Sequence, residues 1–239
     1  MSDPAKIEVC FTPDHFPLFY NTPSIVVVID ILRATSAICT ALHHGVEKII
    51  PVATVEEARA YQKKGYIAAA ERDGEVIEGF SFGNSPFSYM TEQVKGKSLV
   101  LTTTNGTQAI EMARRSFQVV IGSFLNIEAL SNWLIKQEKD VTLLCSGWKN
   151  KFNMEDSVFA GALVKNLLVS PGFKTTCDSA LAAQYLFERA EKDLYNFLEC
   201  SSHRRRLEAL HLEKDIRYCL TANLAPVIPI LKEEALVKL

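Results

Sequence analysis

The sequence predicts an α/β protein with three α/β/α layers around a largely parallel or mixed sheet. Two observations support this class. Short apolar runs rich in Val and Ile alternate along the chain with segments in which apolar residues recur every three or four positions. The 239 residues are 48% hydrophobic and 23% charged, with 11 Gly and 9 Pro, a composition typical of globular proteins rather than of fibrous or disordered chains.

Seven apolar runs are the expected strands, and each is short enough to be a buried strand of a parallel sheet. In chain order they are Ile7–Phe11, Ile25–Ile29, Lys48–Val52, Tyr66–Ala70, Ser98–Leu101, Val119–Gly122 and Val141–Cys145. The second run consists entirely of β-branched residues, which favour extended backbone.

Helical periodicity fills the intervals between these runs. The expected helices are Thr35–His44, Val55–Lys64, Thr107–Ser116, Ile127–Gln137 and Ser157–Leu168, followed by a helix-rich stretch from about Ser179 to Leu220. Thr54 and Glu57 have the spacing of a capping box at the start of the second helix, and Gly65 is a natural end for it.

We expect a single domain over residues 1–239, because no linker, repeat or low-complexity tract interrupts the chain. The composition shifts from strand-rich to helix-rich near residue 150. Two similar lobes with a boundary near 115–150 are therefore the alternative.

Net charge and cysteine content limit the classes of partner and the cellular compartment that we expect for the protein. Lys and Arg total 26 against 28 Asp and Glu, a net charge of −2, so nothing draws the chain to nucleic acid or to an anionic membrane. The six cysteines form no C-x-x-C pair, which favours free thiols in a cytoplasmic protein. No signal peptide or membrane anchor is visible, so we expect a cytoplasmic protein whose partner is a small molecule.

Polar residues collect where the expected strands end, and ligands of open α/β sheets bind beyond the carboxyl ends of the strands. These positions are Asp30, Arg33 and Thr35, then Glu71 and Arg72, then Thr102–Thr107, then Ser123 and Asn126, and finally Cys145–Gly147. A carboxylate such as Asp30 after five β-branched residues is costly without a partner. It is either a Mg²⁺ ligand, a nucleophile towards phosphorus, or the N-cap of the next helix.

The segment Thr102–Thr107 offers hydroxyl and backbone N–H groups at a helix start, where a phosphate or sulfonate binds well. A capped turn without a ligand is the alternative. Neither the Walker pattern nor G-x-G-x-x-G occurs, so these two routes to nucleotide binding are unsupported.

Further acids and bases complete the candidate set. Glu71, Glu155 and Asp156 are possible ligands of a hard divalent cation together with Asp30, although acids at a helix start also complement its dipole. The five histidines lack a zinc-binding spacing. Cys200 to Arg206 fits the C-x₅-R of cysteine phosphatases but follows a helical segment. The basic run Arg204–Arg206 is most simply a solvated helix face, with anion binding as the alternative.

Taken together, these motifs resemble those of the magnesium-dependent 2-phosphosulfolactate phosphatase family. The pieces that carry the resemblance are Val27–Ser36, Glu71-Arg72, Gly79-Phe80, Gly83–Pro86, Thr102–Thr107, Ser123–Asn126, Cys145 with Gly147, Glu155-Asp156 and Asp178. They follow the family order over most of the chain, and the set is specific although each piece alone is weak.

The resemblance implies an α/β/α enzyme that uses Mg²⁺ to hydrolyse 2-phospho-3-sulfolactate to 3-sulfolactate and phosphate, a step of sulfonate metabolism such as coenzyme M biosynthesis. The acidic loop positions of the family map onto Asp30, Glu71, Glu155 and Asp156, and its anion-binding positions map onto Arg33, Arg72 and Thr104–Thr107. From these we infer the individual roles. The expected catalytic residues are Asp30, Glu71 and Asp156, and the expected metal ligands are Asp30, Glu71, Glu155 and Asp156. The expected substrate-binding residues are Arg33, Thr35, Arg72, Asn84, Ser85, Thr104, Asn105, Gly106, Thr107, Ser123 and Asn126.

Three points stay open in this interpretation. Either Asp30 or a metal-activated water attacks phosphorus, with Glu71 or Asp156 as the assisting acid. Ser81 stands where the family commonly has Asp, so another small phosphorylated carboxylic acid is an alternative substrate. A non-catalytic protein that binds small anions is the third reading, and a homo-oligomer is compatible with each of them.

Overall fold

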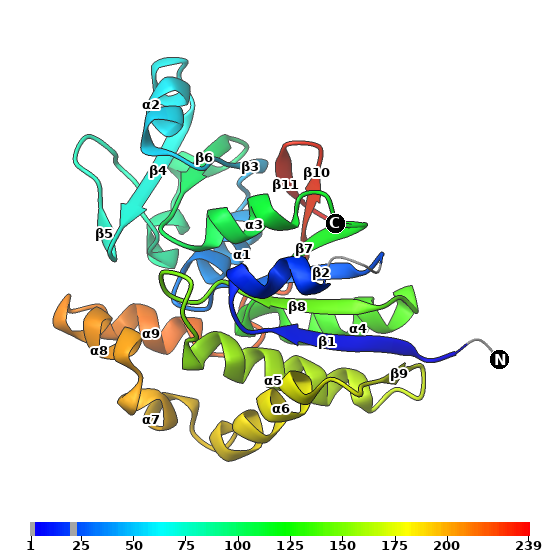
Figure 1. The fold of residues 1–239 in the computed structure, drawn as a ribbon. Coiled ribbons are helices and arrows are strands. Elements are labelled where there is room, and N and C mark those ends of the chain that lie inside the picture. The colour runs from blue at the N-terminus through cyan, green and yellow to red at the C-terminus, as the bar shows by residue number, and fades with distance from the viewer. Residues whose placement is uncertain (1–2, 20–22) are drawn as a thin grey trace.

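The computed structural model describes residues 3–19 and 23–239, and within them helices cover both faces of one mixed sheet of eleven strands (Figure 1). The expected α/β/α class is confirmed. Across the sheet the strand order is β5-β4-β6-β3-β11-β10-β7-β2-β8-β1-β9. The strands are β1 (Ala5–Cys10), β2 (Ile25–Ile29), β3 (Lys48–Pro51), β4 (Ile67–Arg72), β5 (Glu75–Val76), β6 (Ser98–Thr102), β7 (Gln118–Gly122), β8 (Val141–Cys145), β9 (Phe173–Lys174), β10 (Pro229–Lys232) and β11 (Ala235–Lys238).

The strand β2 lies at the centre of the parallel part of the sheet, hydrogen-bonded to β7 on one side and β8 on the other. All five of its side chains are buried. Val27 packs in the cluster on one face of the sheet and Val26 in the cluster on the other. This burial on both faces explains why the run is apolar throughout instead of alternating with polar residues.

Helices occur where periodicity predicts them, with ends shifted by a few residues. They are α1 (Ala34–His43), α2 (Val55–Lys63), α3 (Gly106–Ala113), α4 (Ile127–Gln137), α5 (Met154–Leu168), α6 (Asp178–Ala190), α7 (Leu194–Phe197), α8 (Ser202–Ala209) and α9 (Glu213–Cys219), with 3-10 turns at Pro13–Phe19, Pro86–Tyr89, Glu92–Val94, Phe124–Asn126 and Leu198–Cys200. The predicted capping box is present, since Thr54 accepts from Glu57 N while the Glu57 side chain accepts from Thr54 N.

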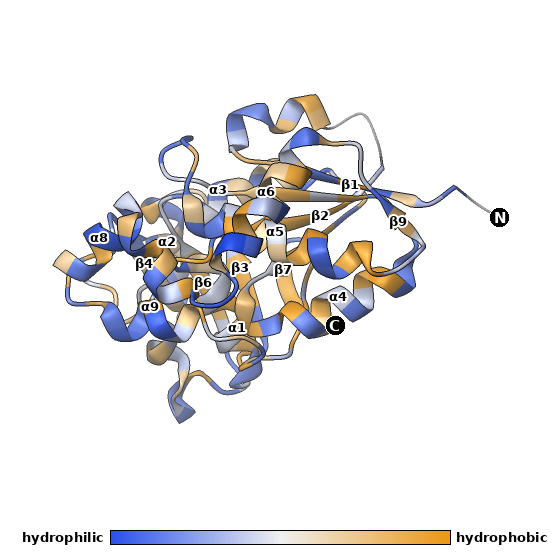
Figure 2. Ribbon diagram, turned by 90° about the horizontal axis from the view of Figure 1, so that it is seen from below, coloured by the Kyte–Doolittle hydropathy of each residue, from blue (hydrophilic) through white to orange (hydrophobic). Residues whose placement is uncertain are grey.

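Apolar clusters lie on both faces of the sheet, and Figure 2 shows hydrophobic residues along its central strands. Helices α4, α5 and α6 contribute to one cluster and α1 and α3 to the other, while α2 packs with β4 and β6 in a third, smaller one. The alternative to a single domain was two lobes with a boundary near 115–150. This range contains β7 and β8, which lie on either side of β2 in the sheet.

The C-terminal hairpin β10–β11 was not predicted. It inserts antiparallel between β7 and β3 and so separates two parallel parts of the sheet. Each of its strands has four residues, and Glu233 adopts a positive φ of 53° in the turn between them. Such short, half-buried strands give almost no periodic signal.

No helix in the described part of the chain combines the length and the apolar character that crossing a bilayer requires.

Candidate active site

A small cavity lies beyond the carboxyl ends of β2 and β4, where the loops after these strands meet α8. Acidic, basic and amide side chains line it together with an indole and an imidazole. The lining residues are Asp30, Leu32, Arg33, Glu71, Gly74, Asn84, Thr104, Asn105, Trp148, His203 and Leu207. The cavity volume of about 10 Å³ holds about one water molecule.

Asp30 is a buried carboxyl group with one oxygen free. Its Oδ1 accepts a hydrogen bond from Ala34 N at 3.2 Å. Ala34 is the first residue of α1, so this contact agrees in part with the alternative that Asp30 caps the helix. Its Oδ2 has no hydrogen-bond or ion-pair partner among residues 3–19 and 23–239, and it lies where a Cβ at Gly106 would be only 2.8 Å away. Burial raises the pKa of Asp30 to about 6, while the nearby charge of His203 opposes that rise.

Asp156 lies behind Asp30 and joins two loops. Its Oδ1 accepts from Ile31 N at 2.8 Å and its Oδ2 accepts from Gly147 N at 3.1 Å, so the loop after β2 is tied to the loop after β8. Burial and the charge of Asp30 raise the pKa of Asp156, and the N–H donors oppose this rise. Asp156 does not line the cavity, so its contacts give it a positioning role.

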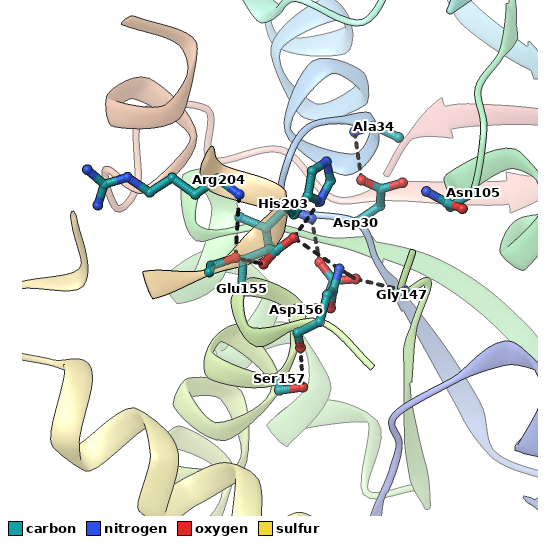
Figure 3. Close-up of polar contacts among 12 residues, drawn as sticks. Asp30, Ala34, Asn105, Gly147, Glu155, Asp156, Ser157, His203 and Arg204 are labelled. Atoms are coloured by element: carbon teal, nitrogen blue, oxygen red, sulfur yellow. Dashed lines mark hydrogen bonds and ion pairs between the residues drawn. The ribbon is translucent and has the colours of Figure 1, made fainter. Parts of the chain in front are cut away.

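Glu155 and His203 form a buried pair beside Asp30 (Figure 3). His203 Nδ1 lies 2.6 Å from Glu155 Oε1, and Ser201 donates to Oε2 at 3.2 Å. Burial alone would raise the pKa of Glu155, but its contacts with His203 and Ser201 hold that pKa below its usual value. An ionised Glu155 accepts the proton of Nδ1, which directs the other ring nitrogen of His203 away from the pair.

The turn between β4 and β5 covers one side of the cavity. Asp73 and Gly74 both have positive φ, 54° and 94°, which is the backbone of a tight two-residue hairpin. Glu71 Oε1 accepts from Gly74 N at 2.5 Å, and its oxygens also accept from the hydroxyl and the N–H of Thr104. Glu71 therefore joins this turn to the loop after β6.

Arg33 lines the cavity, but its guanidinium group binds to other groups of the protein. Nη1 forms an ion pair with Asp215 at 2.6 Å, and Nη2 donates to Gly74 O at 2.7 Å. Both charged side chains are almost fully buried, at 4% and 8% exposure. Arg33 thus holds α9 and the β4–β5 turn together at the cavity wall.

The structure brings only some of the predicted site residues to the cavity. Six of them line it, namely Asp30, Arg33, Glu71, Asn84, Thr104 and Asn105. Asn84 Oδ1 is buried there and has no hydrogen-bond partner within residues 3–19 and 23–239, which leaves an acceptor for a ligand. The predicted residues outside the lining are Thr35, Arg72, Ser85, Gly106, Thr107, Ser123, Asn126, Glu155 and Asp156.

Several of these outer residues have structural contacts instead. Asn126 accepts from Ser123 N and donates to Val227 O, which anchors the C-terminal segment to the loop after β7. Thr107 Oγ1 accepts from Thr103 N and donates to Thr103 O, as in a capped turn. At these positions the contacts fit a role in holding loops and turns in place, which is the alternative to substrate binding.

The four predicted metal ligands do not converge on one point. Within the described residues, no three His, Cys, Asp or Glu side chains are placed to hold a metal ion. The carboxylates of Glu71, Glu155 and Asp156 are already engaged by hydrogen bonds, because each stabilises a loop or a helix start. Asp30 keeps one oxygen free, and Mg²⁺ often takes one or two carboxylates and completes its shell with water and substrate phosphate. Such a site fits the residues, whereas a cage of four carboxylates does not.

Sequence reasoning missed three residues of this region: His203, Trp148 and Asp215. His203 shows no metal-ligand spacing, and its role depends on contact with Glu155, 48 residues away. The expectation that Arg204–Arg206 form a solvated helix face is wrong for Arg204, which is 4% exposed, whereas Arg205 is exposed as expected. Cys200 is exposed in a 3-10 turn before α8, so the C-x₅-R pattern has no phosphate-binding loop after a strand.

Comparisons with known proteins agree over most of the chain. A family model described as 2-phosphosulpholactate phosphatase matches residues 10–234. A relative from Thermotoga petrophila is 43% identical over 205 residues, 86% of this chain and 88% of its own. Relatives from Caldanaerobacter subterraneus subsp. tengcongensis and Clostridium acetobutylicum are 39% and 38% identical, covering 87% and 94% of this chain and 87% and 96% of their own. All three are named "Probable 2-phosphosulfolactate phosphatase".

Proposed function

Because the chain belongs to the 2-phosphosulfolactate phosphatase family, which makes it a phosphoric monoester hydrolase, we propose that it hydrolyses 2-phospho-3-sulfolactate to 3-sulfolactate and inorganic phosphate. In this reaction water supplies the hydroxyl that joins phosphorus. The bond from phosphorus to the C2 oxygen of the substrate breaks, and that oxygen gains a proton.

The observation that carries the proposal is Asp30, a buried carboxylate that lines a cavity beyond the central strand and whose Oδ2 has no partner among the described residues. Phosphoryl transfer requires a nucleophile in line with the leaving oxygen, and donors around the phosphoryl oxygens. Asp30 either attacks phosphorus itself or orients the attacking water. The small cavity has room for that water next to Asp30.

His203 is the group best placed to protonate the leaving oxygen. Its ring lines the cavity, and Nδ1 is held by Glu155, so Nε2 is left to carry the transferred proton. Glu71 and Asp156, the acids considered from the sequence, are occupied by backbone donors. We therefore give the role of proton donor to His203 and a positioning role to these two acids.

Mg²⁺ remains part of the proposal. Asp30 would hold it together with phosphoryl oxygens of the substrate and water. When bound, the ion would offset negative charge on the phosphoryl group as the bond breaks. The residues of the chain then hold the ester in place, with Asn84 and Thr104 in reach of its polar groups from the cavity wall.

Ser81, which stands where the family commonly has Asp, was the reason to consider another small phosphorylated carboxylic acid as the substrate. This residue is exposed and does not line the cavity, so the replacement of an acid there does not alter the described site.

The six free cysteines suit a reducing compartment, and we propose that the enzyme acts in the cytoplasm.

The test is phosphate release from a panel of phosphorylated acids, with Mg²⁺ and with a chelator in its place. We expect the highest kcat/KM for 2-phospho-3-sulfolactate, and a fall of at least a hundredfold without Mg²⁺. Equal rates on phosphorylated acids without a sulfonate would contradict the proposed substrate. Unchanged rates in chelator would remove the metal from the mechanism.

A further inference from the structure

Arg206 on α8 has a guanidinium group with unused donors. Its Nε and Nη2 are buried, and neither has a hydrogen-bond partner among the residues that the structure describes. A buried donor without a partner costs about 1–3 kcal/mol, so such groups are rare unless a ligand completes them. Nε and Nη2 lie on the same edge of the guanidinium, the edge that binds two oxygens of one oxyanion.

The other arginines around the site have protein partners, and within the described residues Arg206 is the arginine with buried nitrogens that lack a hydrogen-bond partner. Arg33 contacts Asp215 and Gly74 O, and Arg72 donates to Glu71 O and Thr102. Arg204, two residues before Arg206, pairs with Glu208, and in Figure 3 its side chain points away from the network around Asp30. The free edge is therefore specific to Arg206 within this group.

Trp148 holds Arg206 next to the cavity. The guanidinium carbon lies 3.4 Å from the centroid of the Trp148 ring, a stacked cation–π contact. Trp148 lines the cavity, and so do His203 and Leu207, which flank Arg206 on α8. Burial lowers the pKa of Arg206, while the charges of Glu155, Asp73 and Glu71 oppose that fall.

We propose that Arg206, stacked on Trp148, binds an anionic group of the substrate other than its phosphoryl group. This inference rests on the proposed function, because 2-phospho-3-sulfolactate has a sulfonate and a carboxylate in addition to the phosphate. Both groups present paired oxygens that match the free edge of a guanidinium. Since Arg206 belongs to α8, which also provides His203 and Leu207 of the cavity lining, this contact also ties α8 to the bound substrate.

The first experiment measures kcat and KM of wild type and Arg206→Gln on three esters: 2-phospho-3-sulfolactate, 2-phospholactate without the sulfonate, and the phosphate ester of 2-hydroxyethanesulfonate without the carboxylate. We expect Arg206→Gln to lose about ten- to a hundredfold in kcat/KM on the full substrate, mainly through KM. The loss shrinks to within about threefold on the ester that lacks the group bound by Arg206, which identifies that group.

Arg205→Gln is the matched control, because Arg205 is an exposed arginine on the same helix. It should change kcat/KM by less than about twofold. An equal loss of Arg206→Gln on all three esters, or no loss on any of them, overturns the inference. Matching urea midpoints of the two variants show that a loss does not come from misfolding.

The second experiment measures binding of 3-sulfolactate by calorimetry and requires no turnover. Wild type should bind it about ten- to a hundredfold more tightly than Arg206→Gln. If wild type hydrolyses none of the esters, the proposed function fails, while the calorimetry still decides about Arg206. Equal affinities of the two proteins, or no binding by either, would overturn the inference.

Discussion

Gly106 and Asp30 lie so close that the first residue of α3 must lack a side chain. A Cβ at position 106 would be 2.8 Å from Asp30 Oδ2 and 2.5 Å from Ala34 Cβ. The carboxylate after β2 therefore rests against the start of α3 only because residue 106 is glycine. This contact sets the position of the free Asp30 oxygen on which the proposed reaction depends.

The first prediction is that Gly106→Ala displaces Asp30. We expect the variant to lose about 1–3 kcal/mol in unfolding free energy and at least tenfold in kcat. Urea unfolding and phosphate release measure the two effects. Gly172→Ala is the control, since a Cβ there meets nothing closer than Ser170 Oγ at 3.6 Å, and wild-type behaviour of Gly106→Ala would contradict the described packing.

The second prediction concerns stability and pH. Burial raises the pKa of Asp30 from 3.8 to about 6 in the folded state, so the folded protein binds the additional proton between these values. Stability then falls as the pH rises through this window, and Asp30→Asn removes that loss. In chelator, the variant should exceed wild type by up to about 3 kcal/mol above pH 7, with little difference near pH 4.

Urea unfolding from pH 4 to pH 8 measures this difference. Asp14→Asn, which removes an exposed carboxylate, is the control and should follow wild type at every pH. A constant difference between Asp30→Asn and wild type across this range would show that Asp30 has no raised pKa.

The third prediction concerns the pair Glu155–His203. Because Glu155 holds Nδ1 at 2.6 Å, His203→Asn removes the proposed proton donor and should lower kcat about 10²- to 10⁴-fold with a smaller change in KM. The loss should be smaller for esters with more acidic leaving alcohols, which require less protonation. His15→Asn, at an exposed histidine, is the control. A uniform loss for all leaving groups would remove His203 from proton transfer.

The fourth prediction concerns the ion pair Arg33–Asp215. Both side chains are buried, so Asp215→Asn leaves an uncompensated cation and should cost about 3–5 kcal/mol of unfolding free energy. Glu111→Gln breaks the more exposed pair with Arg114 and should cost less than about 1 kcal/mol. Equal losses in the two variants would contradict the burial of the first pair.

The sequence predicted seven of the strands and the main helices because their apolar patterns are a local property. It also placed Asp30 and Glu71 at the ends of their strands, and both residues line the cavity, although the antiparallel hairpin separates the parallel part that holds β2 from the one that holds β4. The hairpin β10–β11 escaped prediction because its strands are short and their partners, β7 and β3, are distant in the chain.

The site was predicted less completely for a physical reason. Residues such as Asp156 and Asn126 have the types that bind ligands, but they use their polar atoms to fix loops. His203 and Trp148 enter the site through tertiary contacts of α8 and the loop after β8, which no local spacing reveals. Residue type and strand end indicate where a site lies, whereas free donors and acceptors are known only from the packed structure.

The most direct test of the account is the rate of phosphate release from 2-phospho-3-sulfolactate by Asp30→Asn. We predict a loss of at least 10³-fold in kcat relative to wild type, with Asp14→Asn unchanged, because Asn neither attacks phosphorus nor orients a nucleophile as a carboxylate does. Wild-type activity in Asp30→Asn would contradict the central claim that this buried carboxylate performs the reaction.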